Sequence, residues 1–112
     1  MLAKANRLTK DKEFTKTFRK GRSSYDSIVG VKIIKNNLQI NRFGIIVGRK
    51  VSKKAVERNR IKRQIRAIVR QKIELMKVGS DVLLIITPEA LTVSFRDLEK
   101  SVYLNFKKLE IL

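Results

Sequence analysis

Residues 53–87 read KKAVERNRIKRQIRAIVRQKIELMKVGSDVLLIIT and change from a helical pattern to a short apolar run. The apolar side chains of the first part share one side of an α-helix: Ile61, Ile65, Ile68, Val69 and Met76. We expect this helix to begin near Lys53 or Lys54 and to end near Lys77. The apolar run predicts a buried strand over residues 81–87. A helix packed on a sheet is therefore the central unit.

Basic residues are concentrated on this helix and its approach. The chain carries 27 Lys and Arg against 10 Asp and Glu, a net charge of +17, and residues 49–72 alone hold eleven basic residues and one acid. Residues 80–112 hold four basic residues and five acids. Charge placed in this way indicates docking on a polyanion. Nucleic acid is the first candidate, and an anionic membrane surface is the second.

The side of the helix opposite the apolar residues forms an arginine ridge of Asn59, Arg63, Arg66 and Arg70. Like charges on one helix face repel each other, and no acid is interleaved here, which favours a bound anion. Because guanidinium groups match phosphate oxygens and stack on bases, the ridge favours nucleic acid over lipid headgroups. Arg60 lies beside the ridge. Arg58 and Lys62 lie near the border of the apolar stripe, where they can reach a groove beside the sheet.

The residue types that carry most protein catalysis are missing. The chain has no Cys and no His, which excludes disulfides, thiolate nucleophiles, the usual zinc sites and imidazole acid-base chemistry. Close pairs of acids in the sequence are limited to Asp11 with Glu13 and Asp97 with Glu99. Both pairs fall on predicted helices, where residues two apart point in different directions. We therefore expect no catalytic residue and no metal ion bound by the protein.

Length and composition predict one domain over residues 1–112, with 43% apolar residues to build a single core. No apolar run approaches the length of a membrane span. The first seven residues lack the apolar segment of a signal peptide, so a cytoplasmic location without a membrane is the expectation.

The remaining elements follow from turn residues and alternation. Thr9 is expected to cap a helix that ends near Lys20. Strands are predicted over residues 27–35 and 42–48, with a weaker one over 38–40. A capping box at Ser94 opens a last helix. Its core stripe is expected to be Phe95, Leu98, Val102, Phe106 and Leu109. The order helix, two or three strands, helix, strand, helix predicts an α+β fold, a small two-layer sandwich with a βαβ crossover.

The basic helix resembles the signature of the bacterial ribonuclease P protein component, Ala-x-x-Arg-Asn-Arg-x-Lys-Arg-x-x-Arg. The matching residues are Ala55, Arg58, Asn59, Arg60, Lys62, Arg63 and Arg66. The likeness extends to Asn6-Arg7-Leu8, to a helix with Phe14 and Phe18 that ends at Gly21, and to the segment from Gly44 to Lys50. It covers nearly the whole chain.

This resemblance implies a small α/β sandwich whose βαβ crossover is left-handed, against the usual rule. It also implies that the catalyst is a partner RNA, which holds Mg²⁺ and hydrolyses the phosphodiester at the 5′ end of mature tRNA. No obligate protein partner is expected. By position, the residues that face the catalytic RNA would be Arg58, Asn59, Arg60, Lys62, Arg63 and Arg66, and the ridge adds Arg70.

A cleft between the sheet and the first helix would receive the 5′ leader of precursor tRNA. The resemblance places Phe14 and Phe18 in this cleft, with Lys50 and Lys53 near it. Plain core packing is the competing interpretation of the two phenylalanines, and both roles can hold together. Many members have an aromatic residue where this chain has Lys32, so Lys32 is expected to contact a phosphate instead. Tyr25 is the nearest aromatic residue.

Three other functions fit part of the sequence. A ribosomal or other structural RNA-binding protein matches the charge and size, but the order of motifs disfavours it. A helix-turn-helix DNA reader needs a short helix about three or four residues before its recognition helix, and residues 47–52 leave no room for one. A stand-alone nuclease would need clustered carboxylates for divalent ions.

Overall fold

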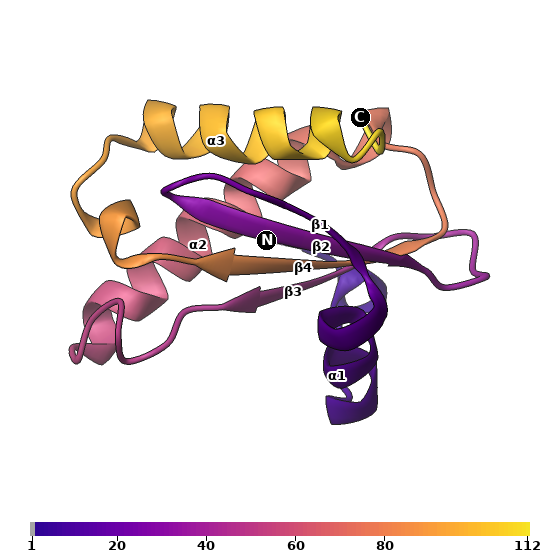
Figure 1. The fold of residues 1–112 in the computed structure, drawn as a ribbon, viewed down its shortest axis with the longest axis horizontal. Helices are drawn as coiled ribbons and strands as arrows, with labels where there is room; N and C mark the ends of the chain where they lie inside the picture. The colour runs from indigo at the N-terminus through magenta and orange to yellow at the C-terminus, as the bar shows by residue number, and fades with distance from the viewer. Residues whose placement is uncertain (1) are drawn as a thin grey trace.

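The computed structural model describes residues 2–112 and confirms the α+β class (Figure 1). Its helices and strands are α1 (Asp11–Lys20), β1 (Arg22–Tyr25), β2 (Val29–Lys35), β3 (Arg42–Ile46), α2 (Ala55–Lys72), β4 (Ser80–Ile86) and α3 (Phe95–Lys108). Short 3-10 helices cover Lys4–Asn6, Ile73–Leu75 and Pro88–Leu91. Within residues 2–112 no helix is long and apolar enough to cross a membrane.

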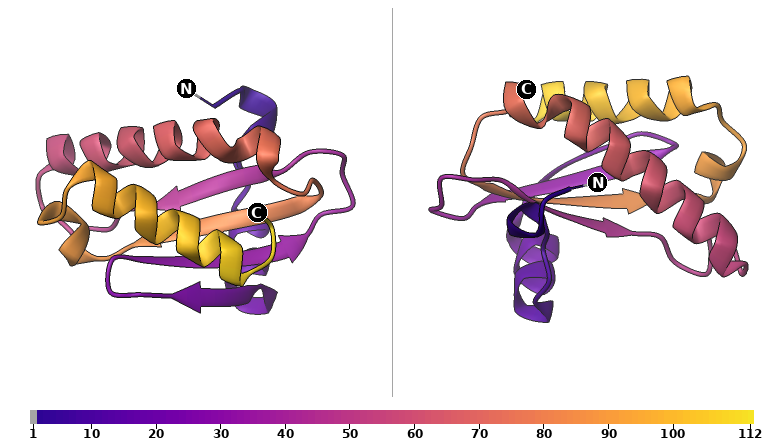
Figure 2. Two further views of the ribbon diagram at one scale, coloured as in Figure 1. Left: turned by 90° about the horizontal axis from the view of Figure 1, so that it is seen from above. Right: turned by 180° about the vertical axis from the view of Figure 1, so that it is seen from behind.

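The four strands form one mixed sheet in the order β1-β2-β4-β3. β2 is antiparallel to both of its neighbours, whereas β3 and β4 are parallel. α2 therefore lies in a βαβ crossover between adjacent strands. In the left view of Figure 2, α2 and α3 face the viewer, β3 and β4 both point left, and the chain passes from β3 through α2 to β4 on the side nearer to α3. This sense is left-handed, as the resemblance implies.

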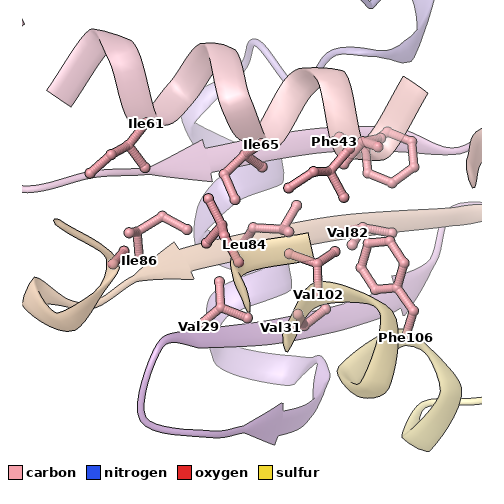
Figure 3. Close-up of a cluster of buried hydrophobic side chains, with 14 of the residues drawn as sticks. Val29, Val31, Phe43, Ile61, Ile65, Val82, Leu84, Ile86, Val102 and Phe106 are labelled. Atoms are coloured by element: carbon pink, nitrogen blue, oxygen red, sulfur yellow. The ribbon is translucent and has the colours of Figure 1, made fainter. Parts of the chain in front are cut away.

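The main core lies between the sheet and the two helices α2 and α3 (Figure 3). The predicted apolar stripe is buried as expected, at Ile61, Ile65, Ile68 and Val69 of α2 and at Met76 beyond the end of the helix. α3 contributes Leu98, Val102 and Phe106. Phe95 was expected in this core, and that prediction is wrong because its side chain is 40% exposed. It stands in the first turn of α3, directly after the capping residue.

α1 lies on the opposite face of the sheet, where it stands across the strands (Figure 1). Its buried residue is Thr17, whose hydroxyl donates to the carbonyl of Glu13 at 2.8 Å. Arg42 on β3 ties the helix to the sheet: its guanidinium contacts both carboxylate oxygens of Asp81 at 2.8 Å and also Glu13 of α1. The hydrogen bond with Asp81 raises the pKa of Arg42 against the opposing effect of burial.

Several predicted boundaries are wrong for identifiable reasons. The cap of α1 is Lys10 and not Thr9, because Glu13 accepts the N–H of Lys10 at 3.3 Å. The strand expected over residues 38–40 is absent, since the side chain of Asn36 braces a turn by accepting from Leu38 N–H and donating to the carbonyl of Ile40. The long helix ends at Lys72 instead of Lys77, in the 3-10 turn that follows. β1 was not predicted, because RSSY lacks apolar alternation.

The turn between β1 and β2 is held by the carboxylate of Asp26. One of its oxygens accepts from the N–H groups of Ile28 and Val29 at 2.8 and 2.9 Å. The other accepts from Ser101 at 2.6 Å and from Asn105 at 3.2 Å, both on α3. Burial acts to raise the pKa of Asp26, but these hydrogen bonds outweigh it and leave the pKa below its usual range. The hairpin is therefore fastened to α3.

Candidate nucleic-acid interface

The outer face of α2 carries the arginine ridge as the helical period predicts. Asn59, Arg63 and Arg70 are exposed, and Arg66 is half-buried. The salt bridges found within residues 2–112 join Arg42 to two acids and Lys72 to Glu99, so the ridge arginines take part in none of them. The opposite side of the same helix is fully buried at Ile61, Ile65, Ile68 and Val69. Packing therefore fixes which side of α2 carries the free cations.

The N-terminal segment adds a basic residue to this face. Leu8 N–H donates to the carbonyl of Phe43 at 2.9 Å, which places the segment along β3. Arg7 then lines a hollow of about 490 Å³ together with Arg63, Arg66 and Ala67. Reasoning from helical periodicity did not assign Arg7 to the interface; its place in the Asn6-Arg7-Leu8 motif was the only available signal.

A smaller groove connects this region with α1. Its lining includes Arg7, Phe14, Gly44, Lys62 and Arg66. The half-buried Lys62 thus reaches the groove beside the sheet, as its position at the border of the apolar stripe predicts.

Arg58 has a different environment from the ridge. It is half-buried, and its guanidinium donates to the carbonyl of Ser52 at 2.9 Å. The hydroxyl of Ser52 donates to Glu57 at 2.5 Å and accepts from Lys54 N–H at 3.0 Å. These bonds fold the loop before α2 against the first turn of the helix. Arg60 is exposed beside them.

The two lysines expected near the cleft lie in the same loop. Lys50 and Lys53 are exposed and line a hollow with Arg49. None of the aromatic residues of α1 lines this hollow. The structure therefore brings the two lysines together with each other and not with Phe14 and Phe18.

Phe14 and Phe18 play different structural parts. Phe14 is half-buried against Gly44 of β3, where a Cβ atom would lie 2.5 Å from the ring. Phe18 is 50% exposed, so it is not a core residue. Lys32 on β2 places its ammonium 4.2 Å from the centre of the Phe18 ring and donates to the carbonyl of Phe18 at 2.8 Å. One face of this ring is thus occupied by a cation, which has further hydrogen-bond donors to offer.

Beyond α1 the same face of the sheet has a strip over which no helix of residues 2–112 lies, called here the uncovered strip. It consists of one residue from each strand in register: Tyr25, Gly30, Ile85 and Ile46. Tyr25 is 51% exposed and Ile46 is 37% exposed. Lys32, two residues after Gly30, points to the same face as the strip. Sequence reasoning missed this strip, because it depends on the pairing of four separate strands.

Carboxylates do not gather on this surface. Across residues 2–112 no three His, Cys, Asp or Glu side chains come close enough to hold a metal ion. Glu13 and Asp81 are both engaged by Arg42.

Solved structures of other proteins have the same architecture. A Staphylococcus aureus RNase P protein, a mutant described as defective in mRNA degradation activity, superimposes with a TM-score of 0.91 at 26% identity and covers 97% of this chain and 92% of its own. The RNase P protein from Thermotoga maritima gives a TM-score of 0.79 at 29% identity, with 87% and 91% covered. The fold is therefore that of bacterial RNase P proteins.

Sequence comparison gives the same result. The family model described as Ribonuclease P matches residues 2–110. A ribonuclease P protein component from Pseudanabaena sp. is 38% identical over 99 residues, which cover 88% of this chain and 85% of the relative. One from Clostridium botulinum (strain Loch Maree) is 35% identical over 109 residues and covers 96% and 97%. The chain belongs to the ribonuclease P protein family and has its role in tRNA processing.

Proposed function

We propose that this chain binds the catalytic RNA of ribonuclease P through α2 and holds the 5′ leader of precursor tRNA in the cleft beside α1. It thereby promotes endonucleolytic removal of the leader. The observation that carries this proposal is the division of α2 into a buried apolar side and an exposed ridge whose arginines have no acidic partner within residues 2–112.

The residues of α2 are suited to the backbone of a folded RNA. Arg63, Arg66 and Arg70 repeat at about one per helical turn, so their guanidinium groups can follow successive phosphates. Arg7 extends this row from the N-terminal segment. Arg58 supports the interface indirectly, since it holds the loop with Lys50 and Lys53 against the helix.

The chemical step is assigned to the RNA. The chain has no His and no Cys to act as base or nucleophile. Mg²⁺ held by the RNA would activate the attacking water and stabilise the leaving oxygen. The residues of the protein would bind and orient the precursor so that its scissile bond meets that centre.

The leader would lie along the sheet between α1 and the uncovered strip. Exposed aromatic rings next to cations are the usual means of binding single-stranded nucleic acid. Phe18 supplies a ring at one wall, and Lys32 supplies a cation beside it. Lys50 and Lys53 lie in the loop between β3 and α2 and would contact phosphates further along the leader.

Replacing Phe18 by leucine is expected to weaken binding of leader-bearing precursor by about 5- to 150-fold, because the stacking plane is lost while apolar bulk remains. Affinity for mature tRNA and for the catalytic RNA should stay at the wild-type level. Titration of the reconstituted complex with each RNA measures these affinities.

Phe95→Leu is the matched control, since Phe95 is similarly exposed but lies on α3, on the other face of the sheet. It should leave every affinity unchanged. Equal losses for all RNAs, together with a lower melting temperature, would show that Phe18 acts only in packing.

A further inference from the structure

The side chain of Tyr25 on β1 packs directly on the backbone of the neighbouring strand β2. It pairs with Gly30 across β1 and β2, and its ring covers the glycine so closely that a Cβ atom there would lie 2.2 Å from the ring. Gly30 is buried, whereas Tyr25 is 51% exposed. One side of the ring therefore rests on the backbone of β2, and the other side faces solvent. Only glycine at position 30 leaves room for this placement.

The ring belongs to the uncovered strip and shares its face with α1. Along the strip, Gly30 is followed by Ile85 and by the exposed Ile46, so the surface next to the ring is apolar. Lys32 lies two residues from Gly30 on the same face, so it is the diagonal neighbour of Tyr25 across the two strands. The Cα atoms of such diagonal neighbours are typically about 7 to 8 Å apart. An open aromatic face thus stands beside an apolar floor and a cation.

The residues on both sides of Tyr25 are hydrogen-bonded to α3. The neighbouring Asp26 directs its carboxylate to Ser101 and Asn105 of α3, on the opposite face, so it places no negative charge over the ring. Ser24 also donates to Asn105, at 2.6 Å. The strand is therefore held in place on both sides of Tyr25, so less ordering of its backbone is needed when a ligand binds.

We propose that Tyr25 is the base-stacking platform of the leader cleft. Gly30 positions this platform, because its lack of a side chain lets the ring lie on the backbone of β2. A nucleobase of the single-stranded leader stacks on the open face of the ring, and Lys32 lies near the adjoining phosphate. This assignment rests on the proposed function and moves the main stacking contact from Phe18 to Tyr25. The Phe18 ring already has a cation on one face, whereas the Tyr25 ring has a face open to solvent. The chain thus places its aromatic platform on β1, next to the lysine on β2.

The test uses this 112-residue chain reconstituted with the catalytic RNA of its source, and two precursors, one with a long leader and one with a single-nucleotide leader. Tyr25→Leu should lower kcat/KM for the long-leader precursor by about 5- to 150-fold. It should leave the single-nucleotide precursor unchanged. Tyr25→Phe keeps the stacking plane and should behave as wild type.

Gly30→Ala tests the position of the Tyr25 ring without changing the Tyr25 side chain itself. The added methyl group displaces the ring, which is the far end of a flexible surface side chain, so the strand should stay folded while the preference for the long leader falls. Tyr103→Leu is the control, because Tyr103 is the only other tyrosine and lies exposed on α3. It should change neither precursor.

Equal losses for both precursors, or no loss in Tyr25→Leu, would overturn the assignment. Phe18→Leu, measured in parallel, distinguishes a failure of the Tyr25 platform from a failure of leader binding as a whole. A lost leader preference in Phe18→Leu but not in Tyr25→Leu would refute the platform and leave the leader cleft in place. A wild-type complex that treats both precursors alike would refute leader binding itself, and the platform with it.

Discussion

Replacing Arg63, Arg66 and Arg70 together by alanine is expected to lower the affinity for the catalytic RNA by about 100-fold at physiological salt. Each phosphate contact that is lost reduces the number of counterions released on binding, and it lowers the magnitude of the negative slope of log affinity against log salt by about 0.7 to 0.9. The magnitude of the slope should therefore be smaller by about 2 to 3 in the triple variant than in the wild type. Its melting temperature should change little, because the three side chains lie on the outer side of α2.

A matched variant distinguishes a located interface from a general effect of charge. Arg96, Lys100 and Lys108 are exposed on α3, and replacing all three by alanine removes the same charge from another surface. This variant should keep nearly all of its affinity. If both triple variants lost affinity and slope equally, α2 would not be the interface.

Arg42→Leu is expected to lower the free energy of unfolding by about 3 kcal/mol, because it strands a buried carboxylate. Arg42 contacts both oxygens of Asp81, whose side chain is only 8% exposed. Without the guanidinium, Asp81 keeps a hydrogen bond from Asn36 at 2.9 Å but has no countercharge. α1 loses its link through Glu13 at the same time. Urea unfolding of the purified chain measures the change.

Lys72→Leu is the control for this ion pair. Lys72 and Glu99 also form a salt bridge, but at 3.9 Å and with Glu99 35% exposed on its side chain. Its loss should cost less than about 1 kcal/mol. Similar losses in Arg42→Leu and Lys72→Leu would mean that the buried pair contributes no more to stability than a surface one.

The basic helix was predictable because the helical repeat of about 3.6 residues that places the apolar side chains on one side also places the arginines on the other. Ile61, Ile65 and Ile68 had to be buried together, and this placed Arg63 and Arg70 outside. The polar strand β1 was not predictable in this way, since RSSY becomes a strand only through its pairing with β2. Local patterns report burial, and β1 is mostly exposed.

The candidate leader surface beside α1 depends still more on tertiary contacts. Phe14 and Phe18 look alike in the sequence, but Phe14 packs against Gly44, whereas the Phe18 ring is contacted by Lys32. The seating of Tyr25 on Gly30 depends on the register of two strands joined by a turn. No periodicity reports such contacts, so the sequence indicated the aromatic residues without their division of labour.

The central claim is that the protein binds and positions RNA while the RNA partner cleaves. The most direct measurement is leader release from precursor tRNA in Mg²⁺ by the protein alone, and by the protein with the catalytic RNA of its source. We expect no cleavage by the protein alone and full cleavage when the RNA is added. Cleavage without the RNA that persists through repurification, and that disappears when Asp or Glu residues are replaced, would contradict it.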